Sequence, residues 1–350
     1  MPGTERIVSD PRIAIVGATG AVGRVALQIL EERNFPLSAL RLTASQRSIG
    51  KTLTFRGEQL PIEETTPRLL AESDIAFVSA NDDISREIGE LGPQQGCIVI
   101  DDSGVWRMDP AVPLVVPEIN ASDIDWHAGL LAIPNCSTTP LAMALCALGA
   151  DNAVKRVIAS TYQSVSGTGT AAVAELKGQA GQVLAGQPTT PTSYPHQIAF
   201  NVLPHIGSLK EDDYFSEEVK MRQETQKILH AQIAMSTTCV RVPVPISHSE
   251  AVHVEFERPM DPSDARKLLA AFPGMVVTDD PANAEYPMPI DAAGRDETFV
   301  GRIRKDTSNA NGLVMWIVSD NLRKGAATNA VQIAEEIVKR GAWLHERVSK

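Results

Sequence analysis

The amino-acid sequence predicts an α/β fold, in which a doubly wound parallel sheet is joined to an α+β domain with a broad mixed sheet. In the first third of the chain, short apolar runs alternate with helical patterns, which is typical of a parallel sheet covered by helices. From about Asn152 onward, the apolar runs become longer and β-rich, as expected for a wide sheet in a second domain.

Each expected element rests on such a pattern. Five short runs predict the strands of the first domain, namely 13–16, 40–44, 75–80, 97–101 and 130–133. Four longer β-rich runs predict strands of the second domain, namely 154–165, 236–245, 251–257 and 313–318. Apolar residues at helical spacing predict a C-terminal amphipathic helix over 325–343. We expect one domain of residues 1–135, completed by the C-terminal helix 325–350, and a second domain of residues 136–324.

Length and composition indicate a two-domain globular protein and exclude several other classes of protein. With 350 residues, 43% of them hydrophobic, the chain is long enough for two domains with substantial cores. A net charge of −11 without a basic stripe argues against a nucleic-acid partner. No apolar stretch approaches the roughly 20 residues that span a bilayer, so no membrane association is expected. The four cysteines lack metal-ligand spacing, which predicts no metal site and a reducing, cytoplasmic location.

Three glycines follow the first expected strand at the spacing G-x-x-G-x-x-G. Glycine allows a tight turn, lets a pyrophosphate approach the backbone, and lets the next helix pack closely on the sheet. The helix N-terminus then faces the phosphate, so a Rossmann-type dinucleotide site is predicted, although a tight turn without a ligand has the same pattern. The candidate contacts are Gly17, Thr19, Gly20, Ala21, Val22 and Gly23.

The end of the second expected strand indicates which cofactor binds. An NAD enzyme usually offers an acidic residue there to the ribose 2′-hydroxyl, but this chain has Ser45, Arg47 and Ser48 and no acid. A guanidinium offers a planar fork of donors to phosphate oxygens. The sequence therefore favours NADP(H) over NAD(H), and the alternative is an exposed loop with a solvated arginine.

Cys136 follows the fifth expected strand and precedes an apolar helical run. A thiol at a helix N-terminus meets the positive end of the helix dipole and free backbone N–H groups, and both favour the thiolate. The same N–H groups can hold an oxyanion on an attacked acyl carbon. By position alone, Cys136 fits equally well as a small buried hydrophobic residue.

Four polar residues lie at strand ends where they could complete a site around this thiol. His248 is expected in a polar turn between two β runs, where it could stabilise a thiolate and move protons near neutral pH. Arg241 and the glycine-rich strand end after Gln163 belong to the same domain, whereas Arg107 follows a strand of the first domain. Each also has an ordinary structural explanation, such as a turn or a surface ion pair.

Together these motifs resemble the aspartate-semialdehyde dehydrogenase family, in the branch of glyceraldehyde-3-phosphate-dehydrogenase-like enzymes that reduce acyl phosphates. The resemblance runs from the glycine turn to residues 320–327, so it covers nearly the whole chain. The matching stretches, in the same order as in the family, are Ser45–Ser48, 134–139 (Pro-Asn-Cys-Ser-Thr-Thr), the strand end at Gln163, Arg241 with 248–250, and 321–325.

The resemblance implies a role for each matching residue. Cys136 would be the nucleophile, His248 the acid/base, and Gln163 the residue that orients the substrate. Arg241 would clamp the substrate carboxylate through its guanidinium. Glu217 and Lys220, which share a helix face, would meet the substrate amine and the phosphate. The other implied contacts are Arg107 and Asn135 for phosphate, Ser166 and Gly167 for the cofactor, and Asn321 for the nicotinamide amide.

The implied reaction is the NADPH-dependent reductive dephosphorylation of L-4-aspartyl phosphate to L-aspartate 4-semialdehyde through a thioacyl group on Cys136. It would serve the biosynthesis of lysine, threonine and methionine. N-acetyl-glutamyl-phosphate reductase shares the chemistry, but its substrate has a blocked amine that leaves Glu217 without a partner. Reduction of a thioester such as malonyl-coenzyme A is another alternative. A catalytically silent NADP-binding paralogue is a third, and the intact Cys136–His248 pair argues against it.

The resemblance further implies a homodimer or a dimer of dimers, with the β-rich catalytic domain at the interface and the first domain binding NADP. Three positions depart from the family pattern. Ser247 stands where glycine often precedes the histidine, and Asn81-Asp82-Asp83 replaces small residues near the expected cofactor. Thr328 replaces a more usual apolar residue, with no functional effect expected.

Overall fold

The computed structural model describes residues 8–344, so the outermost residues of the predicted first domain, 1–7 and 345–350, lie outside the described residues. The chain divides into two compact units. The first runs to Pro134 and resumes at Ala326, and the second is Asn135–Gly325. No helix among residues 8–344 is long and apolar enough to cross a membrane.

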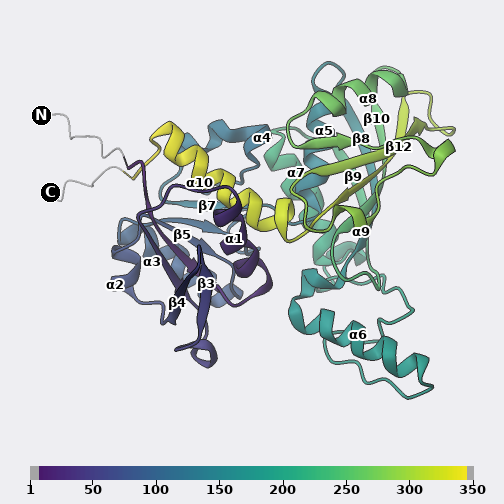
Figure 1. Ribbon diagram of the computed structural model, residues 1–350. Coiled ribbons are helices and arrows are strands. Elements are labelled where there is room, and N and C mark those ends of the chain that lie inside the picture. Colours follow the sequence, from purple (N-terminus) through teal and green to yellow (C-terminus); the bar gives the residue numbers. More distant parts are fainter. Residues whose placement is uncertain (1–7, 345–350) are drawn as a thin grey trace, which may run out of the picture. The chain divides into compact units, whose positions relative to one another are not determined.

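A seven-stranded sheet forms the centre of the first unit (Figure 1). Its strands are β1 (Arg12–Val16), β2 (Ala39–Thr43), β3 (Thr52–Phe55), β4 (Glu58–Glu63), β5 (Ile75–Val78), β6 (Ile98–Asp101) and β7 (Leu130–Ala132). Their order is β3-β4-β2-β1-β5-β6-β7, and all neighbours are parallel except β3 and β4. Every residue of β5 and β6 is buried, because helices cover both faces of a parallel sheet.

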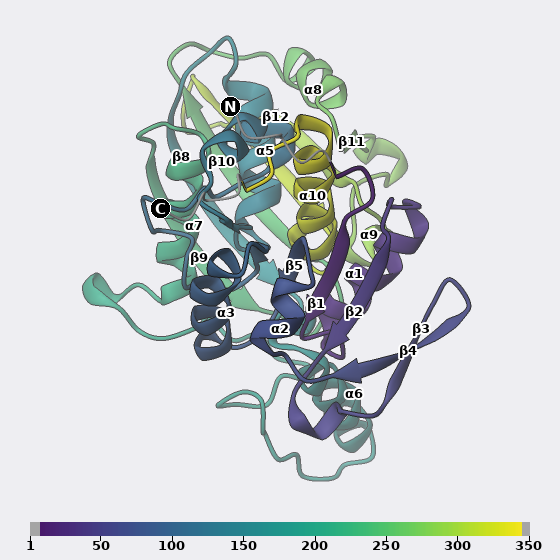
Figure 2. The same ribbon diagram turned by 90° about the vertical axis from the view of Figure 1, so that its left-hand side faces the viewer.

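The described part of this unit contains the α-helices α1 (Ala21–Glu32), α2 (Pro67–Ala71), α3 (Asp82–Gln94), α4 (Pro117–Asn120) and α10 (Thr328–Arg340). Helix α10 packs against α1 and β6, so the end of the chain completes the unit in which it begins (Figure 2). Strand β1 lies between β2 and β5, where the strand order reverses. Ligands of doubly wound sheets bind outside the carboxyl ends of the strands at this point.

The second unit is built on a six-stranded mixed sheet. Its strands are β8 (Val154–Gln163), β9 (Ala234–Arg241), β10 (His248–Phe256), β11 (Met275–Val277), β12 (Thr298–Lys305) and β13 (Gly312–Ser319). Their order is β11-β12-β13-β10-β8-β9, with parallel pairing in β8–β9 and β11–β12 and antiparallel pairing elsewhere.

Most of the helices that pack on this sheet lie on one of its faces, and a short helix packs against Phe299 and Val318 on the other face. Helices α5 (Thr138–Gly149), α7 (Ser216–Ile228) and α8 (Pro262–Ala271) pack against one another or against the sheet. On β10, Val252, Val254 and Phe256 are buried whereas His253 between them is exposed, as expected when alternate side chains face a core and an open surface. Helix α6 (Thr170–Leu184) begins an excursion that projects away from the sheet (Figure 1), and α9 (Pro289–Ala292) is a single turn.

The predicted α/β class with its parallel and mixed sheets is confirmed, and all nine predicted strands are present within a few residues. Strands β3, β4, β11 and β12 were not predicted, since they are short or partly exposed and lack a long apolar run. The prediction that His248 lies in a turn is wrong. It is the first residue of β10, pairs with Ser319 and is buried.

Candidate active site

Cys136 lies in the turn that opens α5, two residues before the helix begins at Thr138. Asn135 shapes this turn, because its side-chain oxygen accepts from the Ser137 N–H at 2.9 Å and its carbonyl accepts from the Thr138 N–H at 2.9 Å. The backbone of Gly325 packs directly on Cys136, and a Cβ on Gly325 would lie 2.9 Å from the Cys136 Cβ. The thiol is therefore held at the start of a helix, where the dipole favours a thiolate.

The structure brings His248 to this thiol. His248 Nε2 lies 3.3 Å from Cys136 Sγ, although the two residues are 112 positions apart in the chain. Burial and, to a smaller extent, the charge of Arg241 hold the pKa of His248 well below its usual range. The ring is therefore neutral around pH 7 and presents one N–H donor and one acceptor.

A buried carboxylate gathers several of the predicted substrate residues. Glu217 Oε1 accepts from Asn135 Nδ2 at 2.8 Å and from Gln163 Nε2 at 2.9 Å, and Lys220 Nζ lies 3.6 Å from Glu217 Oε2. Burial alone would raise the pKa of Glu217, but the Lys220 charge and the two amide donors outweigh it, so the pKa lies below its ordinary value. An ionised carboxylate inside the protein is a site for a cation.

Arg241 is buried at the end of β9, and one of its donors remains unused. Its Nη1 donates to the Ser164 carbonyl at 2.6 Å, whereas its Nε is buried and has no hydrogen-bond partner among the described residues. A Cβ on Gly167 would lie 3.1 Å from Arg241 Nη1 and 3.3 Å from His248 Nε2, so the glycine leaves the space between them open. An unsatisfied buried guanidinium N–H is suited to a carboxylate ligand.

The predicted dinucleotide turn opens onto a hollow of about 440 Å³ in the first unit. It is lined by the glycine turn, by the end of β2 and by the residues after β5, among them Gly17, Thr19, Gly20, Ser45, Ser79 and Asn81. Gly17 has φ +90°, and a Cβ there would collide with the carbonyl of Ser79. The residues present therefore fit a dinucleotide at the point where the strand order reverses.

The remaining predicted contacts lie in three places. Ala21, Val22 and Gly23 form the first turn of α1, and Arg47 and Ser48 lie in a short 3-10 helix after β2, with Arg47 exposed and Ser48 Oγ 3.5 Å from Thr19 Oγ1. Arg107 belongs to the first unit, where it donates to the Asp102 carbonyl at 2.7 Å. In the second unit, the Asn321 side-chain oxygen accepts from Ser166 Oγ at 3.0 Å.

Two departures from the family pattern have a structural explanation. Ser247 has φ +73°, a left-handed conformation that favours glycine, and its N–H donates to Asn321 Oδ1 at 2.9 Å. Asn81 is the N-cap of α3 and accepts from the Ile84 N–H at 3.0 Å, while Asp82 and Asp83 occupy the acidic first turn. Thr328 is the first residue of α10 and is buried.

Two residues that contact the Cys136 turn, and a third on the strand of His248, were not predicted from the sequence. Glu224, two helical turns after Glu217, accepts the Asn135 N–H at 2.7 Å, and Gly325 packs on Cys136. The helical spacing of 217 and 224 was a signal for the first of them. The third, Glu250, lies two residues after His248 on β10, and both of its oxygens are buried without a hydrogen-bond partner among the described residues.

Burial raises the pKa of Glu250 well above its usual range, so the folded protein holds this proton to a higher pH than the unfolded chain does. Below the unfolded-state pKa of about 4.3, both states bind the proton and folding is unaffected. As the pH rises above it, the unfolded chain releases the proton first, and stability falls by about 1.4 kcal/mol per pH unit until the folded-state pKa is reached.

Glu250→Gln should therefore raise the free energy of unfolding, and the gain should grow as the pH rises above the unfolded-state pKa of about 4.3, because the amide cannot ionise. Urea unfolding at several pH values measures this gain. Glu257→Gln, at an exposed position after the same strand, should show no such trend. A gain for Glu250→Gln that is equal at all pH values would contradict a protonated Glu250.

Two family models match the chain. The model described as semialdehyde dehydrogenase, NAD binding domain, covers residues 12–127, and the model described as semialdehyde dehydrogenase, dimerisation domain, covers residues 146–324. Among curated relatives, the aspartate-semialdehyde dehydrogenase of Aquifex aeolicus is 51% identical and covers 94% of this chain and 98% of its own length. That of Bacillus subtilis is 44% identical over 93% of this chain and 97% of its own length.

Solved structures agree with these relatives. Aspartate semialdehyde dehydrogenase II from Vibrio cholerae superimposes with a TM-score of 0.92 at 41% identity, covering 94% of this chain and 99% of that chain. A second structure of that enzyme, complexed with ASA, gives the same TM-score of 0.92. These matches favour neither the N-acetyl-glutamyl-phosphate nor the malonyl-coenzyme A alternative. With family models matching both units and a curated relative that is 51% identical, the chain belongs to the aspartate-semialdehyde dehydrogenase family.

Proposed function

We propose that the chain reduces L-4-aspartyl phosphate to L-aspartate 4-semialdehyde with NADPH, through a thioacyl group on Cys136. The observation that carries this proposal is the 3.3 Å approach of His248 Nε2 to Cys136 Sγ at the start of a helix. Oxidation of NADPH, followed with aspartyl phosphate, N-acetyl-glutamyl phosphate or malonyl-coenzyme A, tests it. We expect turnover with aspartyl phosphate, and turnover with either other substrate alone would overturn the assignment.

In the proposed reaction, the Cys136 thiolate attacks the acyl carbon of the substrate, a C–S bond forms, and the C–O bond to phosphate breaks. A bound nicotinamide supplies the hydride that reduces the thioester. His248 faces the sulfur, and it would meet the substrate oxygen that becomes negative and act there as the acid/base partner. When the C–S bond breaks, the aldehyde leaves and Cys136 is restored as thiolate. None of the four cysteines, which all lie in the described part of the chain, forms a disulfide, and this suits the cytoplasm, the proposed compartment.

Two charged residues are proposed to recognise the amino-acid part of the substrate. Glu217, buried and ionised, would take its ammonium group. The unused N–H of Arg241 would take its α-carboxylate, with Gln163 orienting the acyl group between them. Lys220, 39% exposed beside Glu217, and Asn135 would receive the phosphate, and Arg107 is proposed as a further phosphate ligand.

We propose NADP(H) as the cofactor, because the hollow at the glycine turn ends at Ser45 and the following residues carry a cation and hydroxyls but no acid. Arg47 is exposed and makes no hydrogen bond among the described residues, so its donors are available to a 2′-phosphate. The turn of Gly17 and Gly20 would hold the pyrophosphate at the N-terminus of α1.

Arg47→Ala should weaken use of NADPH much more than use of NADH. Losing charge-assisted hydrogen bonds to a phosphate costs about 1.5–3 kcal/mol, which corresponds to about a 10- to 150-fold rise in KM. Initial rates with each cofactor measure the change, and Arg68→Ala, an exposed arginine on α2, is the control. Equal use of both cofactors by the wild type would contradict the 2′-phosphate site.

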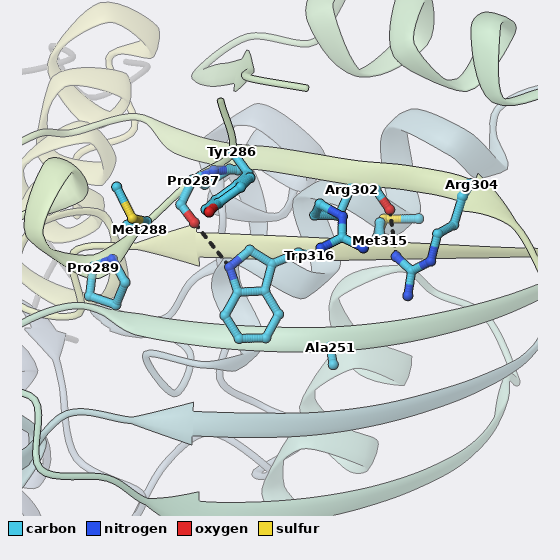
Figure 3. A pocket seen from close by; sticks show the side chains of 9 residues that line it. All are labelled: Ala251, Tyr286, Pro287, Met288, Pro289, Arg302, Arg304, Met315 and Trp316. Atoms are coloured by element: carbon cyan, nitrogen blue, oxygen red, sulfur yellow. Dashed lines mark hydrogen bonds between the residues drawn. The ribbon is translucent and has the colours of Figure 1, made fainter. Parts of the chain in front are cut away.

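We propose that the open face of the six-stranded sheet pairs with the same face of a second copy of the chain. It belongs to the segment matched by the dimerisation-domain model, and Ile158 and Tyr162 on it are each 40% exposed. Figure 3 shows a hollow on this face, of about 420 Å³, in which Trp316 donates to the Pro287 carbonyl at 3.1 Å. Exposed aromatic and aliphatic groups on one sheet face are typical of a self-complementary interface. We propose a homodimer, and a dimer of dimers is the alternative assembly.

A further inference from the structure

The imidazole of His248 has a second nitrogen, Nδ1, which faces away from Cys136. It lies 3.0 Å from the backbone nitrogen of Ser164 and 3.0 Å from the Ser164 hydroxyl oxygen. A backbone N–H can only donate, so Nδ1 must be the acceptor in this bond. Because a neutral imidazole carries one proton, that proton must lie on Nε2, 3.3 Å from Cys136 Sγ.

The Ser164 peptide is held so that its N–H cannot turn away. Arg241 Nη1 donates to the Ser164 carbonyl at 2.6 Å, and the Ser164 hydroxyl donates to Asn321 Oδ1 at 3.1 Å. Ser164 and Asn321 are both buried, so water does not compete for these bonds. The donor to His248 is therefore fixed from the carbonyl side and from the side chain.

The orientation of Asn321 is itself determined by a backbone donor. The Ser247 N–H lies 2.9 Å from Asn321 Oδ1, which must therefore be the oxygen and not the nitrogen of the amide. Ser166 Oγ donates to the same oxygen at 3.0 Å. Only the nitrogen of the Asn321 amide is then left for the nicotinamide, so it could serve a cofactor only as a donor.

We propose that Ser164 is a positioning residue that keeps His248 neutral with its proton on Nε2, so that His248 meets sulfur and substrate oxygen as a hydrogen-bond donor. This inference rests on the proposed Cys136 chemistry and specifies how His248 enters it. The Nε2–H of His248 stabilises the thiolate form of Cys136. In the thiol form, the proton on the sulfur would face the Nε2 proton and neither group would have an acceptor. The same N–H can stabilise the negative oxygen of the thiohemiacetal.

The alternative is an imidazolium, with protons on both nitrogens of His248. In that state the Nδ1–H would face the Ser164 N–H, and the cation would lie close to the Arg241 guanidinium in a buried site. Two donors that face each other lose a hydrogen bond, and two buried cations repel. The charge of Arg241 therefore favours the same neutral ring as the Ser164 N–H does.

Nitrogen-15 labelling of the seven histidines tests the proton position directly in the full-length wild type. Long-range proton–nitrogen spectra distinguish a ring protonated on Nε2 from one protonated on Nδ1, and His248→Gln identifies the signals of His248. We expect Nε2 to carry the proton at neutral pH. A proton on Nδ1, or on both nitrogens, would overturn the proposal whether or not the enzyme turns over aspartyl phosphate.

Ser164→Ala tests the positioning role. It removes the hydroxyl that holds the Ser164 peptide on Asn321 and keeps the backbone N–H that faces Nδ1. The donor is then held less firmly, so part of the His248 rings should move their proton to Nδ1, and kcat should fall about tenfold while KM stays within about twofold. Ser249→Ala is the matched control, because the Ser249 hydroxyl is buried beside His248 without a partner among the described residues. If both variants behave alike in the spectra and in kcat, Ser164 does not position His248. Absence of turnover in the wild type would instead refute the proposed function.

Discussion

Cys136→Ala should abolish turnover, with kcat at least about 10⁴-fold below that of the wild type. The alanine cannot form the C–S bond of the proposed thioacyl group, so the path through two easier steps is lost. The substitution only removes an atom from a turn that Asn135 and Gly325 hold in place, so the fold should persist. NADPH binding, measured by fluorescence, should stay near the wild-type value because the dinucleotide hollow belongs to the other unit.

Alkylation separates this thiol from the other three. Burial raises the pKa of Cys97 to about 12 and also raises the pKa values of Cys146 and Cys239, so these thiols are almost fully protonated at neutral pH. Iodoacetamide should therefore label Cys136 first, with loss of activity in parallel. Mass mapping that finds another cysteine labelled first would contradict the assignment of Cys136 as the nucleophile.

Glu217→Gln should lower kcat/KM for aspartate semialdehyde in the phosphate-dependent reverse reaction by about 30- to 5,000-fold. Losing one partner of a desolvated charge pair costs about 2–5 kcal/mol, which gives this range. The glutamine keeps the size of Glu217 and one of its oxygens but removes the charge that the substrate ammonium needs. Initial rates over a range of semialdehyde concentrations measure the effect.

Two controls accompany this variant. NADP binding should be unchanged, since Glu217 contacts Asn135, Gln163 and Lys220 in the second unit and not the dinucleotide hollow. The wild type should show negligible activity with N-acetyl-glutamate semialdehyde, whose amine cannot be charged. If that semialdehyde is the better substrate, or if Glu217→Gln has wild-type kinetics, the aspartate assignment fails even though the Cys136 chemistry survives.

The fold could be predicted largely because its buried strands carry an uninterrupted apolar signal. Strands β5 and β6 are buried on both faces and read as continuous apolar runs, and the glycine turn is visible because Gly17 needs a positive φ. Edge strands such as β3 and β11 have no such signal. His248 was assigned to a turn because three polar residues in a row begin β10, and only the neighbouring strands and helices bury them.

The predicted site residues of the second unit come together, but their connections could not be read from the sequence. Gln163 and Glu217 are 54 positions apart, and Ser164 and Asn321 are 157 apart, so only the folded sheet brings each pair into hydrogen-bond distance. Ser164 is one serine of a polar run, and Glu250 resembles an ordinary strand residue. Their importance depends on which groups face them, which is a property of the three-dimensional structure.

The most direct test of the proposed chemistry is to look for the acyl group on Cys136. Enzyme mixed with aspartyl phosphate in the absence of NADPH, quenched in acid and digested, should carry an aspartyl thioester on the peptide that contains Cys136. One phosphate should be released per active site, and later addition of NADPH should convert the adduct to aspartate semialdehyde. Cys136→Ala should form no adduct. NADPH-dependent turnover by the wild type without an adduct or a phosphate burst, or with the aspartyl group on another cysteine, would contradict the account.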